Sequence, residues 1–208
     1  MDTTKRYKAV FFDLGGTLRI ALLEEPWMRH ARRKMAEIAG SPVPYEEFYQ
    51  MIEERYEPYR KWALGENKES GDEELWCKWL LPDYDQARIK QVCHELSFQY
   101  RQCKGRRVVV DGGVEVIKGL HERGYKLGII SNLIGENEVP DWLEEDGLDQ
   151  YSDTVILSSV CHMRKPCFEI YQLAAKEMGV ELSECVSVAD SIKRDIPGAK
   201  KAGVGCNI

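Results

Sequence analysis

The sequence predicts an α/β fold, and three patterns indicate it. From residue 107 onward, short apolar segments alternate with segments of helical periodicity, as in a parallel sheet covered by helices on both faces. A further apolar strand, Val10–Phe12, lies close to the beginning of the chain. Between these parts, residues 19–107 show helical periods and no repeated strand pattern. We therefore expect a Rossmann-like parallel sheet core with an inserted helical-bundle cap domain.

The first half of the expected core consists of three strands and one helix, and the second strand is the apolar run after Arg107. Val10–Phe12 is the first strand, and the alternating pattern resumes with the apolar run that follows Arg107. Apolar residues at helical spacing predict a helix over residues 113–123, which Gly124 ends because glycine readily adopts the left-handed conformation of a helix C-terminus. The apolar segment 125–130 then predicts a buried strand.

The second half continues the alternation. Residues 153–159 predict the next strand. The helix after it is expected to begin with Pro166 in its first turn and to end at Gly179, since proline is favoured at helix starts and glycine just past helix ends. Residues 185–190 predict another strand, and residues 195–203 a short helix. A further edge strand after this helix is expected to be absent or trimmed.

The expected core comprises residues 1–18 and 108–208, and the expected cap comprises residues 19–107. Twelve of the 20 aromatic residues fall in the cap segment, which favours the core of a small helical bundle. The alternative is that a few of them line a substrate pocket. Residues 63–74, ALGENKESGDEE, are polar and contain glycine, so we expect them to form an exposed connection between cap helices.

The composition excludes some classes of partner. The net charge is −6, which gives no electrostatic basis for binding nucleic acid. The apolar run near the N-terminus is too short for a signal or membrane segment, so we expect no membrane association and a cytoplasmic location. The seven cysteines are odd in number and lack CxxC or His-containing metal spacing, which predicts reduced thiols.

Four polar residues lie just beyond four predicted strands. They are Asp13, Ser131, Lys165 and Asp190, of which Lys165 lies a few residues further beyond its strand than the others. Because parallel strands deliver their carboxyl ends to one edge of a sheet, we expect these side chains to converge there. Paired carboxylates suit Mg²⁺, whereas a lysine and a hydroxyl suit a phosphoryl group. A receiver-type phosphoacceptor domain combines similar groups, but the order of the motifs and the long helical insertion fit that class poorly.

The motifs resemble those of the haloacid dehalogenase (HAD) superfamily, in the branch whose helical cap follows the first strand. FFDLGGTL is similar to the family pattern D-x-D-G-T, IISN to the hydroxyl motif, RKP to the lysine motif, and VADSIKRDIPGAKKAG to the closing acidic motif. The closing motif is the most specific, because Asp190 and Asp195 fall at family spacing. The resemblance covers nearly the whole chain.

The resemblance implies a role for each matched residue. Asp13 would attack phosphorus and become an aspartyl phosphate that water hydrolyses. Lys165 would pair with the phosphate and the nucleophile, while Ser131 and the backbone amide of Asn132 would bind a phosphoryl oxygen. Thr17 would brace the first loop.

The resemblance also implies a Mg²⁺ site. Its ligands would be Asp13, the backbone carbonyl of Gly15 and Asp190, with Asp195 supporting it through water. In the family, the position of Gly15 is an aspartate that protonates the leaving group and then activates water. Glycine keeps the carbonyl and lacks the acid, so we expect an intact metal site with a weakened acid/base step.

Four nearby residues are candidates for compensating or binding roles. His162, His30 and Glu24 are considered as replacement acids, although an ordinary surface role is the simpler interpretation of each. Arg19 directly follows the first loop and is either a solvated hinge charge or a partner for an anionic part of the substrate.

These observations predict a Mg²⁺-dependent phosphohydrolase of small phosphorylated metabolites. Two alternatives remain open: a non-catalytic phospholigand-binding or regulatory protein, and a dehalogenase or phosphonate-cleaving hydrolase. The expected partner is a small phosphorylated molecule, whose identity the sequence does not give. The oligomeric state is also left open.

Overall fold

The computed structural model describes residues 6–208 and contains a five-stranded parallel sheet. The strand order is β5-β4-β1-β6-β7, with β1 in the centre. The strands are β1 (Ala9–Phe12), β4 (Lys126–Ser131), β5 (Thr154–Leu157), β6 (Cys185–Val188) and β7 (Cys206–Asn207). The predicted α/β core with a parallel sheet is confirmed, and the chain forms a two-residue edge strand, β7, where none was expected.

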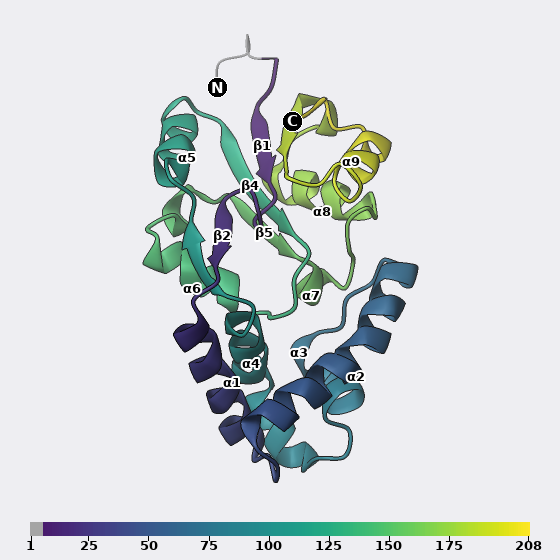
Figure 1. Ribbon diagram of the computed structural model, residues 1–208. Coiled ribbons are helices and arrows are strands. Elements are labelled where there is room, and N and C mark those ends of the chain that lie inside the picture. The colour runs from purple at the N-terminus through teal and green to yellow at the C-terminus, as the bar shows by residue number, and fades with distance from the viewer. Residues whose placement is uncertain (1–5) are drawn as a thin grey trace.

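Helices cover both faces of this sheet (Figure 1). Val10 and Phe12 of β1 pack on one face with α5 (Gly113–Glu122) and α6 (Glu138–Glu145). Ala9 and Phe11 point to the other face, which α8 (Glu169–Met178) and α9 (Ile196–Ala202) cover. Successive strand residues face opposite sides, so a central strand covered on both sides is apolar throughout, as this one is. The remaining short elements of the core are η2 (Asp149–Tyr151), α7 (Ser158–Cys161) and η3 (Leu182–Glu184).

Two short strands join the sheet to the helical insert. β2 (Arg19–Leu22) and β3 (Arg106–Val109) form an antiparallel ribbon of their own, with Arg19 opposite Val109. The expectation of no strand within residues 19–107 is therefore wrong, and the apolar run after Arg107 is not a strand of the parallel sheet. A four-residue strand is too short to produce a clear period-2 pattern, so its pairing is visible only in the structure.

The insert between β2 and β3 is helical and has its own apolar core. Its elements are α1 (Glu25–Ala39), α2 (Tyr45–Glu66), α3 (Asp72–Glu74), the π-helical turn η1 (Leu75–Leu80) and α4 (Gln86–Gln102). Figure 1 shows these helices together in the lower part of the molecule, below the sheet. Phe48, Tyr59, Trp76 and Tyr100 are buried in this core. Most insert aromatics therefore serve packing, while Trp27 and Phe98 line a cavity.

The polar segment 63–74 is not an exposed connection. Its first residues complete α2, and Glu69, Ser70 and Asp72 are only 2%, 1% and 1% exposed. A buried carboxylate is tolerated only when it is paired, and Glu69 accepts hydrogen bonds from the hydroxyls of Tyr59 and Ser158 and forms an ion pair with Arg164. The polarity of this segment therefore reflects a buried polar network and not exposure to solvent.

Two further boundaries differ from the sequence prediction. Helix α8 begins at Glu169, so Pro166 precedes it and does not occupy its first turn. Helix α6, whose Val139 and Trp142 are buried, was not predicted, because a proline interrupts its short apolar pattern.

Within residues 6–208, no helix combines the length and apolarity needed to cross a membrane. All seven cysteines are free.

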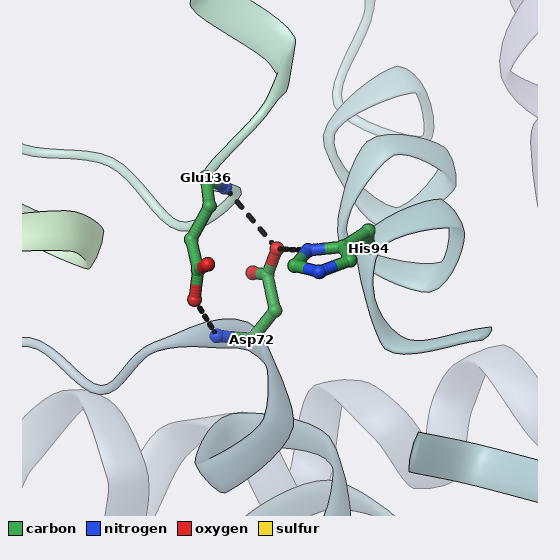
Figure 2. A group of neighbouring side chains, drawn as sticks. All are labelled: Asp72, His94 and Glu136. Carbon is green, nitrogen blue, oxygen red and sulfur yellow. Dashed lines mark hydrogen bonds and ion pairs between the residues drawn. The ribbon is translucent and has the colours of Figure 1, made fainter. Parts of the chain in front are cut away.

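Asp72, His94 and Glu136 meet where the insert contacts the loop after β4 (Figure 2). These side chains are of types that bind metals, but both carboxylate oxygens of Asp72 and Oε1 of Glu136 already have partners. Asp72 accepts hydrogen bonds from the backbone N–H of Glu136 at 3.1 Å and the hydroxyl of Ser97 at 2.5 Å, and lies 2.8 Å from Nδ1 of His94. Glu136 in turn accepts from the backbone N–H of Asp72 at 2.7 Å. We assign this cluster to joining the insert and the core.

Candidate active site

Asp13 and Lys165 form a buried pair at the carboxyl edge of the sheet. Asp13 directly follows β1, and Lys165 lies on the loop after α7. Nζ of Lys165 donates to Oδ1 of Asp13 at 2.7 Å and to the carbonyl oxygen of Ile130 at 2.8 Å. It also lies 2.6 Å from Oδ1 of Asp195. The three charged side chains are 8%, 4% and 2% exposed, so their interactions are only weakly screened by solvent.

The side chain of Asn132 fixes the position of the Lys165 loop. Its Oδ1 accepts a hydrogen bond from the backbone N–H of Lys165 at 2.8 Å, and its Nδ2 donates to the carbonyl of Lys165 at 2.9 Å. Ser131 is the last residue of β4, is 4% exposed and lines the same cavity as Asp13 and Lys165. The ends of β1 and β4 and the loop after β5 therefore meet at one place.

Three carboxylates converge beside this pair. One oxygen each of Asp13, Asp190 and Asp195 lies within 4.8 Å of the others. Burial raises the pKa of Asp195, and the charge of Asp13 raises it further, while Lys165 opposes both effects. Oδ1 of Asp195 is paired with Lys165, and Oδ2 is buried without a hydrogen-bond donor among residues 6–208. A cluster of oxygen donors with unsatisfied lone pairs fits a hard divalent cation such as Mg²⁺.

The two glycines after Asp13 face different surroundings. Gly16 has a φ of +84°, and a Cβ at this position would lie 2.6 Å from Oδ2 of Asp190. This position needs glycine both for its conformation and for the approach of the Asp190 carboxylate. Gly15 has no such restriction, since a Cβ there would meet no atom within 4 Å. The site therefore has open space where the acid of the D-x-D pattern would stand.

A cavity of about 110 Å³ opens at Asp13. Besides the residues above, its lining includes four arginines and one tryptophan, namely Arg19, Arg101, Arg107, Arg194 and Trp142. Arg19 is 6% exposed, donates to Asp146 at 2.7 Å and lies 4.2 Å from the ring centroid of Trp142. Burial lowers the pKa of Arg19, and Asp146 opposes this effect. Arg19 is thus not the solvated hinge charge that the sequence suggested.

The family model for haloacid dehalogenase-like hydrolases matches residues 7–203. The chain belongs to this family. A glyceraldehyde 3-phosphate phosphatase of Pyrococcus abyssi is 30% identical over 203 residues, which span 95% of this chain and 79% of that protein. The protein of the same name from Methanopyrus kandleri is 28% identical over 207 residues, or 95% of this chain and 81% of its own length.

Solved structures of HAD proteins have the same fold. A HAD phosphatase of Thermococcus onnurineus is 26% identical, with a TM-score of 0.58 and coverage of 96% of this chain and 85% of that chain. A 2-haloacid dehalogenase of Pseudomonas syringae has a TM-score of 0.68 over 96% of this chain and 85% of its own, at 20% identity. At that identity, the second likeness concerns the fold alone.

Several residues considered from the sequence lie away from the cavity of this HAD-like hydrolase. His162 was considered as a replacement acid facing Asp13, and this expectation is wrong. It lines a different cavity, where its Nδ1 lies 3.2 Å from the carbonyl oxygen of Glu69. His30 is exposed on α1, and Glu24 pairs with Arg106 at 2.9 Å. The hydroxyl of Thr17 is buried, has no hydrogen-bond partner in the part of the chain that the structure describes, and does not line the cavity.

Sequence reasoning missed three cavity-lining residues that stand outside the motifs of this hydrolase. Arg101 comes from the end of α4, Arg107 from β3 and Trp142 from α6. None belongs to a motif, and each stands in a segment whose neighbours are also charged or aromatic. Only the packing of the insert against the sheet brings them together, so no spacing in the sequence could have identified them.

Proposed function

We propose that the chain is a Mg²⁺-dependent phosphohydrolase that acts on small phosphorylated metabolites through an aspartyl phosphate on Asp13. The observation that carries this proposal is the position of the Lys165 ammonium, 2.7 Å from Asp13 and 2.6 Å from Asp195, beside a third carboxylate. Such a cluster combines a nucleophile with the positive charge that an anionic phosphoryl group requires. The phosphatase names of the relatives support the same chemistry.

In the proposed reaction, an oxygen of Asp13 attacks phosphorus and the bond from phosphorus to the ester oxygen breaks. The leaving alkoxide takes up a proton and departs as an alcohol. Water then attacks the aspartyl phosphate, which releases inorganic phosphate and restores the carboxylate. Lys165 offsets the charge of the phosphoryl group, while the hydroxyl of Ser131 and the backbone N–H of Asn132 donate to its oxygens.

The cation would be held by the carboxylates of Asp13, Asp190 and Asp195 and the backbone carbonyl of Gly15. When bound, Mg²⁺ neutralises phosphoryl charge and aligns the reacting groups. Gly16 lets Asp190 approach the Asp13 loop, because a side chain there would occupy the place of the Asp190 carboxylate.

The absence of a side chain at Gly15 determines which substrates should react. An alkyl phosphate needs its leaving oxygen protonated, whereas an aryl or acyl phosphate leaves as a weakly basic anion. General acid/base help is worth roughly 10²- to 10⁴-fold, so alkyl phosphates should react more slowly than aryl or acyl phosphates by a comparable factor. Water-mediated protonation would replace the missing acid.

The insert would cover the reaction. We propose a division into a core of residues 1–18 and 108–208 and a cap of residues 19–107, because α4 and the β2–β3 ribbon supply part of the cavity lining. A covered cavity excludes bulk water during transfer. We also propose a cytoplasmic location, which the seven free cysteines support.

The test is phosphate release from aryl, acyl and alkyl phosphates, with Mg²⁺ and with a chelator. We expect Mg²⁺-dependent release that Asp13→Asn abolishes and the exposed Asp149→Asn control does not affect. Beryllium fluoride should bind to Asp13 in a crystal grown with Mg²⁺. Release that persists in Asp13→Asn, or beryllium fluoride bound elsewhere, would contradict the proposal.

The alternative of a non-catalytic phospholigand-binding protein has one observation in its favour, the missing acid at Gly15. It predicts tight binding of a phosphorylated ligand without release from any substrate in the panel. A dehalogenase is not favoured, because the cluster of three carboxylates suits a cation. Activity on 2-haloacids without metal would restore that interpretation.

A further inference from the structure

Three of the four arginines that line the cavity at Asp13 lie outside the closing acidic motif. Arg19 comes from β2, Arg101 from α4 and Arg107 from β3, and all three are separate from the residues that would bind the phosphoryl group. They lie on the insert or on the ribbon that connects it to the sheet. One small cavity therefore contains a nucleophile with its lysine and, in addition, a second concentration of positive charge.

Two of these arginines have acidic partners. Arg19 pairs with Asp146 at 2.7 Å, and Arg101 pairs with Glu138. Burial raises the pKa of Glu138 to about 7, so this carboxylate offsets the charge of Arg101 only in part near neutral pH. Both guanidiniums also lie against the ring of Trp142, at 4.2 and 5.4 Å from its centroid, which holds their planes in place.

Arg107 has no comparable partner. Within residues 6–208, no carboxylate lies within ion-pair distance of its guanidinium, and its Nε is buried without a hydrogen-bond acceptor. Burial lowers the pKa of Arg107, and Arg101 and Arg19 lower it further, while Glu138 opposes them. A buried donor left without an acceptor costs free energy, which an anion in the cavity would recover.

The hydrogen bond through which Arg107 stabilises the β2–β3 ribbon uses its backbone and not its guanidinium. The carbonyl of Arg107 does accept a hydrogen bond from Arg19 at 3.0 Å, and this contact needs no particular side chain at position 107. The guanidinium is therefore not explained by the fold. Its planar set of donors is suited to binding both oxygens of a carboxylate or a phosphoryl group.

We propose that Arg107, supported by Arg101 and Arg19, binds a second anionic group of the substrate, a carboxylate or a second phosphoryl group, while the reacting phosphoryl group lies at Asp13. This inference rests on the proposed function and specifies its substrate class. It also separates this chain from the named substrate of its relatives, because glyceraldehyde 3-phosphate has a single anionic group.

The test compares substrates that differ only in the second group. Glycerol 3-phosphate has none, 3-phosphoglycerate has a carboxylate, and glycerol 1,3-bisphosphate has a second phosphoryl group. We expect kcat/KM to be higher for one or both doubly anionic compounds, and the better of the two identifies the group that Arg107 binds.

The decisive variant is Arg107→Met, which keeps an unbranched apolar stem and removes the charged guanidinium. We expect kcat/KM for the preferred compound to fall about 10- to 100-fold relative to glycerol 3-phosphate, mainly through KM, because a hydrogen bond to a charged group is lost. Arg107→Lys keeps the charge and should retain part of the preference. It also provides the test if the methionine variant does not fold.

The matched control is Arg106→Met. Arg106 precedes Arg107 on the same strand, but its guanidinium pairs with Glu24 at 2.9 Å and does not line the cavity at Asp13. We expect the substrate preference of this control to equal that of the unaltered protein. An equal loss in both variants would overturn the proposed subsite.

Binding to the Asp13→Asn protein separates this inference from the proposed function. Calorimetry should show that 3-phosphoglycerate or the bisphosphate binds more tightly than glycerol 3-phosphate, and that Arg107→Met removes the difference. Hydrolysis without any preference for a second anion overturns the inference and leaves the proposed function intact. Binding that depends on Arg107, without hydrolysis of any compound, overturns the proposed function and supports the subsite.

Discussion

Glu69 of the helical insert forms an ion pair with Arg164, the residue before Lys165. The Glu69 side chain is fully buried, and it also accepts hydrogen bonds from Tyr59 and Ser158. The backbone joins the same contact, since Lys68 forms an antiparallel bridge with Met163. The position of the lysine loop therefore depends on the insert as well as on the sheet.

Replacing Glu69 should destabilise the protein. Glu69→Ala leaves Arg164 half-buried without its carboxylate, and removing one partner of such a pair costs about 3 to 5 kcal/mol. Chemical denaturation would measure the loss in the free energy of unfolding. Glu66→Ala, at an exposed position of the same segment, is the control and should change stability by no more than about 0.5 kcal/mol. Equal effects of the two variants would show that the Glu69 network contributes nothing.

Gly15→Asp should raise activity on alkyl phosphates. The structure has room for the new side chain, and the backbone of Gly15 is not in the left-handed region. A carboxylic acid at this position would protonate the leaving oxygen, so kcat should increase by roughly 10²- to 10⁴-fold. The matched control is Gly15→Asn, which has nearly the same shape and cannot act as an acid. A similar gain in both variants would assign the effect to something other than proton transfer.

Gly16→Ala should be far more damaging than Gly15→Ala. The alanine at position 16 would be held at a φ of +84°, where an L-residue costs about 1 to 2 kcal/mol, and its Cβ would meet the Asp190 carboxylate. We expect lower stability and weaker Mg²⁺ binding, measured by denaturation and by calorimetry. Gly15→Ala should leave both quantities close to those of the unaltered protein. If both alanine variants behave alike, Asp190 does not depend on the approach that Gly16 allows.

Mg²⁺ should stabilise the folded protein. Binding of the cation would relieve the repulsion among Asp13, Asp190 and Asp195, and a ligand at 100 times its Kd adds about 2.7 kcal/mol to the free energy of unfolding. Thermal unfolding with Mg²⁺ and with a chelator would measure this difference. Asp190→Asn should abolish most of it, and Asp149→Asn should not. Stabilisation that survives in Asp190→Asn would place the cation elsewhere.

Stability should fall as pH rises from about 4.5 to 7 through the ionisation of Glu138. The folded-state pKa of about 7 lies above the ordinary value of 4.5, so in this range the folded protein keeps a proton that the unfolded chain has released. The lost stability amounts to about 3 kcal/mol at most. Arg101, Arg107 and Arg19 face this carboxylate and limit the effect, whereas burial causes it.

The measurement compares the unaltered protein with Glu138→Gln at pH 5 and pH 8. As pH rises, the unaltered protein should lose stability relative to Glu138→Gln. The variant lacks this loss because glutamine has no carboxyl group to ionise. The exposed Glu144→Gln, on the same helix, controls for general charge effects. A pH-independent difference would mean that Glu138 ionises normally.

The sequence predicted the core and its strand-end residues because local patterns determine both. An apolar strand followed by Asp13, Ser131 or Asp190 can be recognised without knowing the contacts, and parallel pairing then brings the strand ends together. The insert was predicted less completely. Glu69 and Asp72 are acids whose burial depends on partners 89 and 64 residues away, so their polarity alone suggested an exposed loop.

The roles of the cavity arginines could not be predicted from local sequence patterns, because they too depend on contacts between distant segments. Arg101 and Arg107 have neighbours of similar charge in the sequence, and of these two guanidiniums only that of Arg101 has a carboxylate partner among the described residues. The distinction arises from the packing of α4 and β3 against α6, which no short segment of sequence encodes. Arg19 was singled out by its place after the first loop, but its burial against Trp142 was not foreseen.

The β2–β3 ribbon contains both Arg19 and Arg107 and provides the two covalent connections between the helical insert and the parallel sheet. A rotation of the insert about this ribbon would turn both guanidiniums with it. The same rotation would withdraw Glu69 from Arg164 and bring its carboxylate into water. Entry of a substrate by that route would therefore be coupled to hydration of the Glu69 carboxylate.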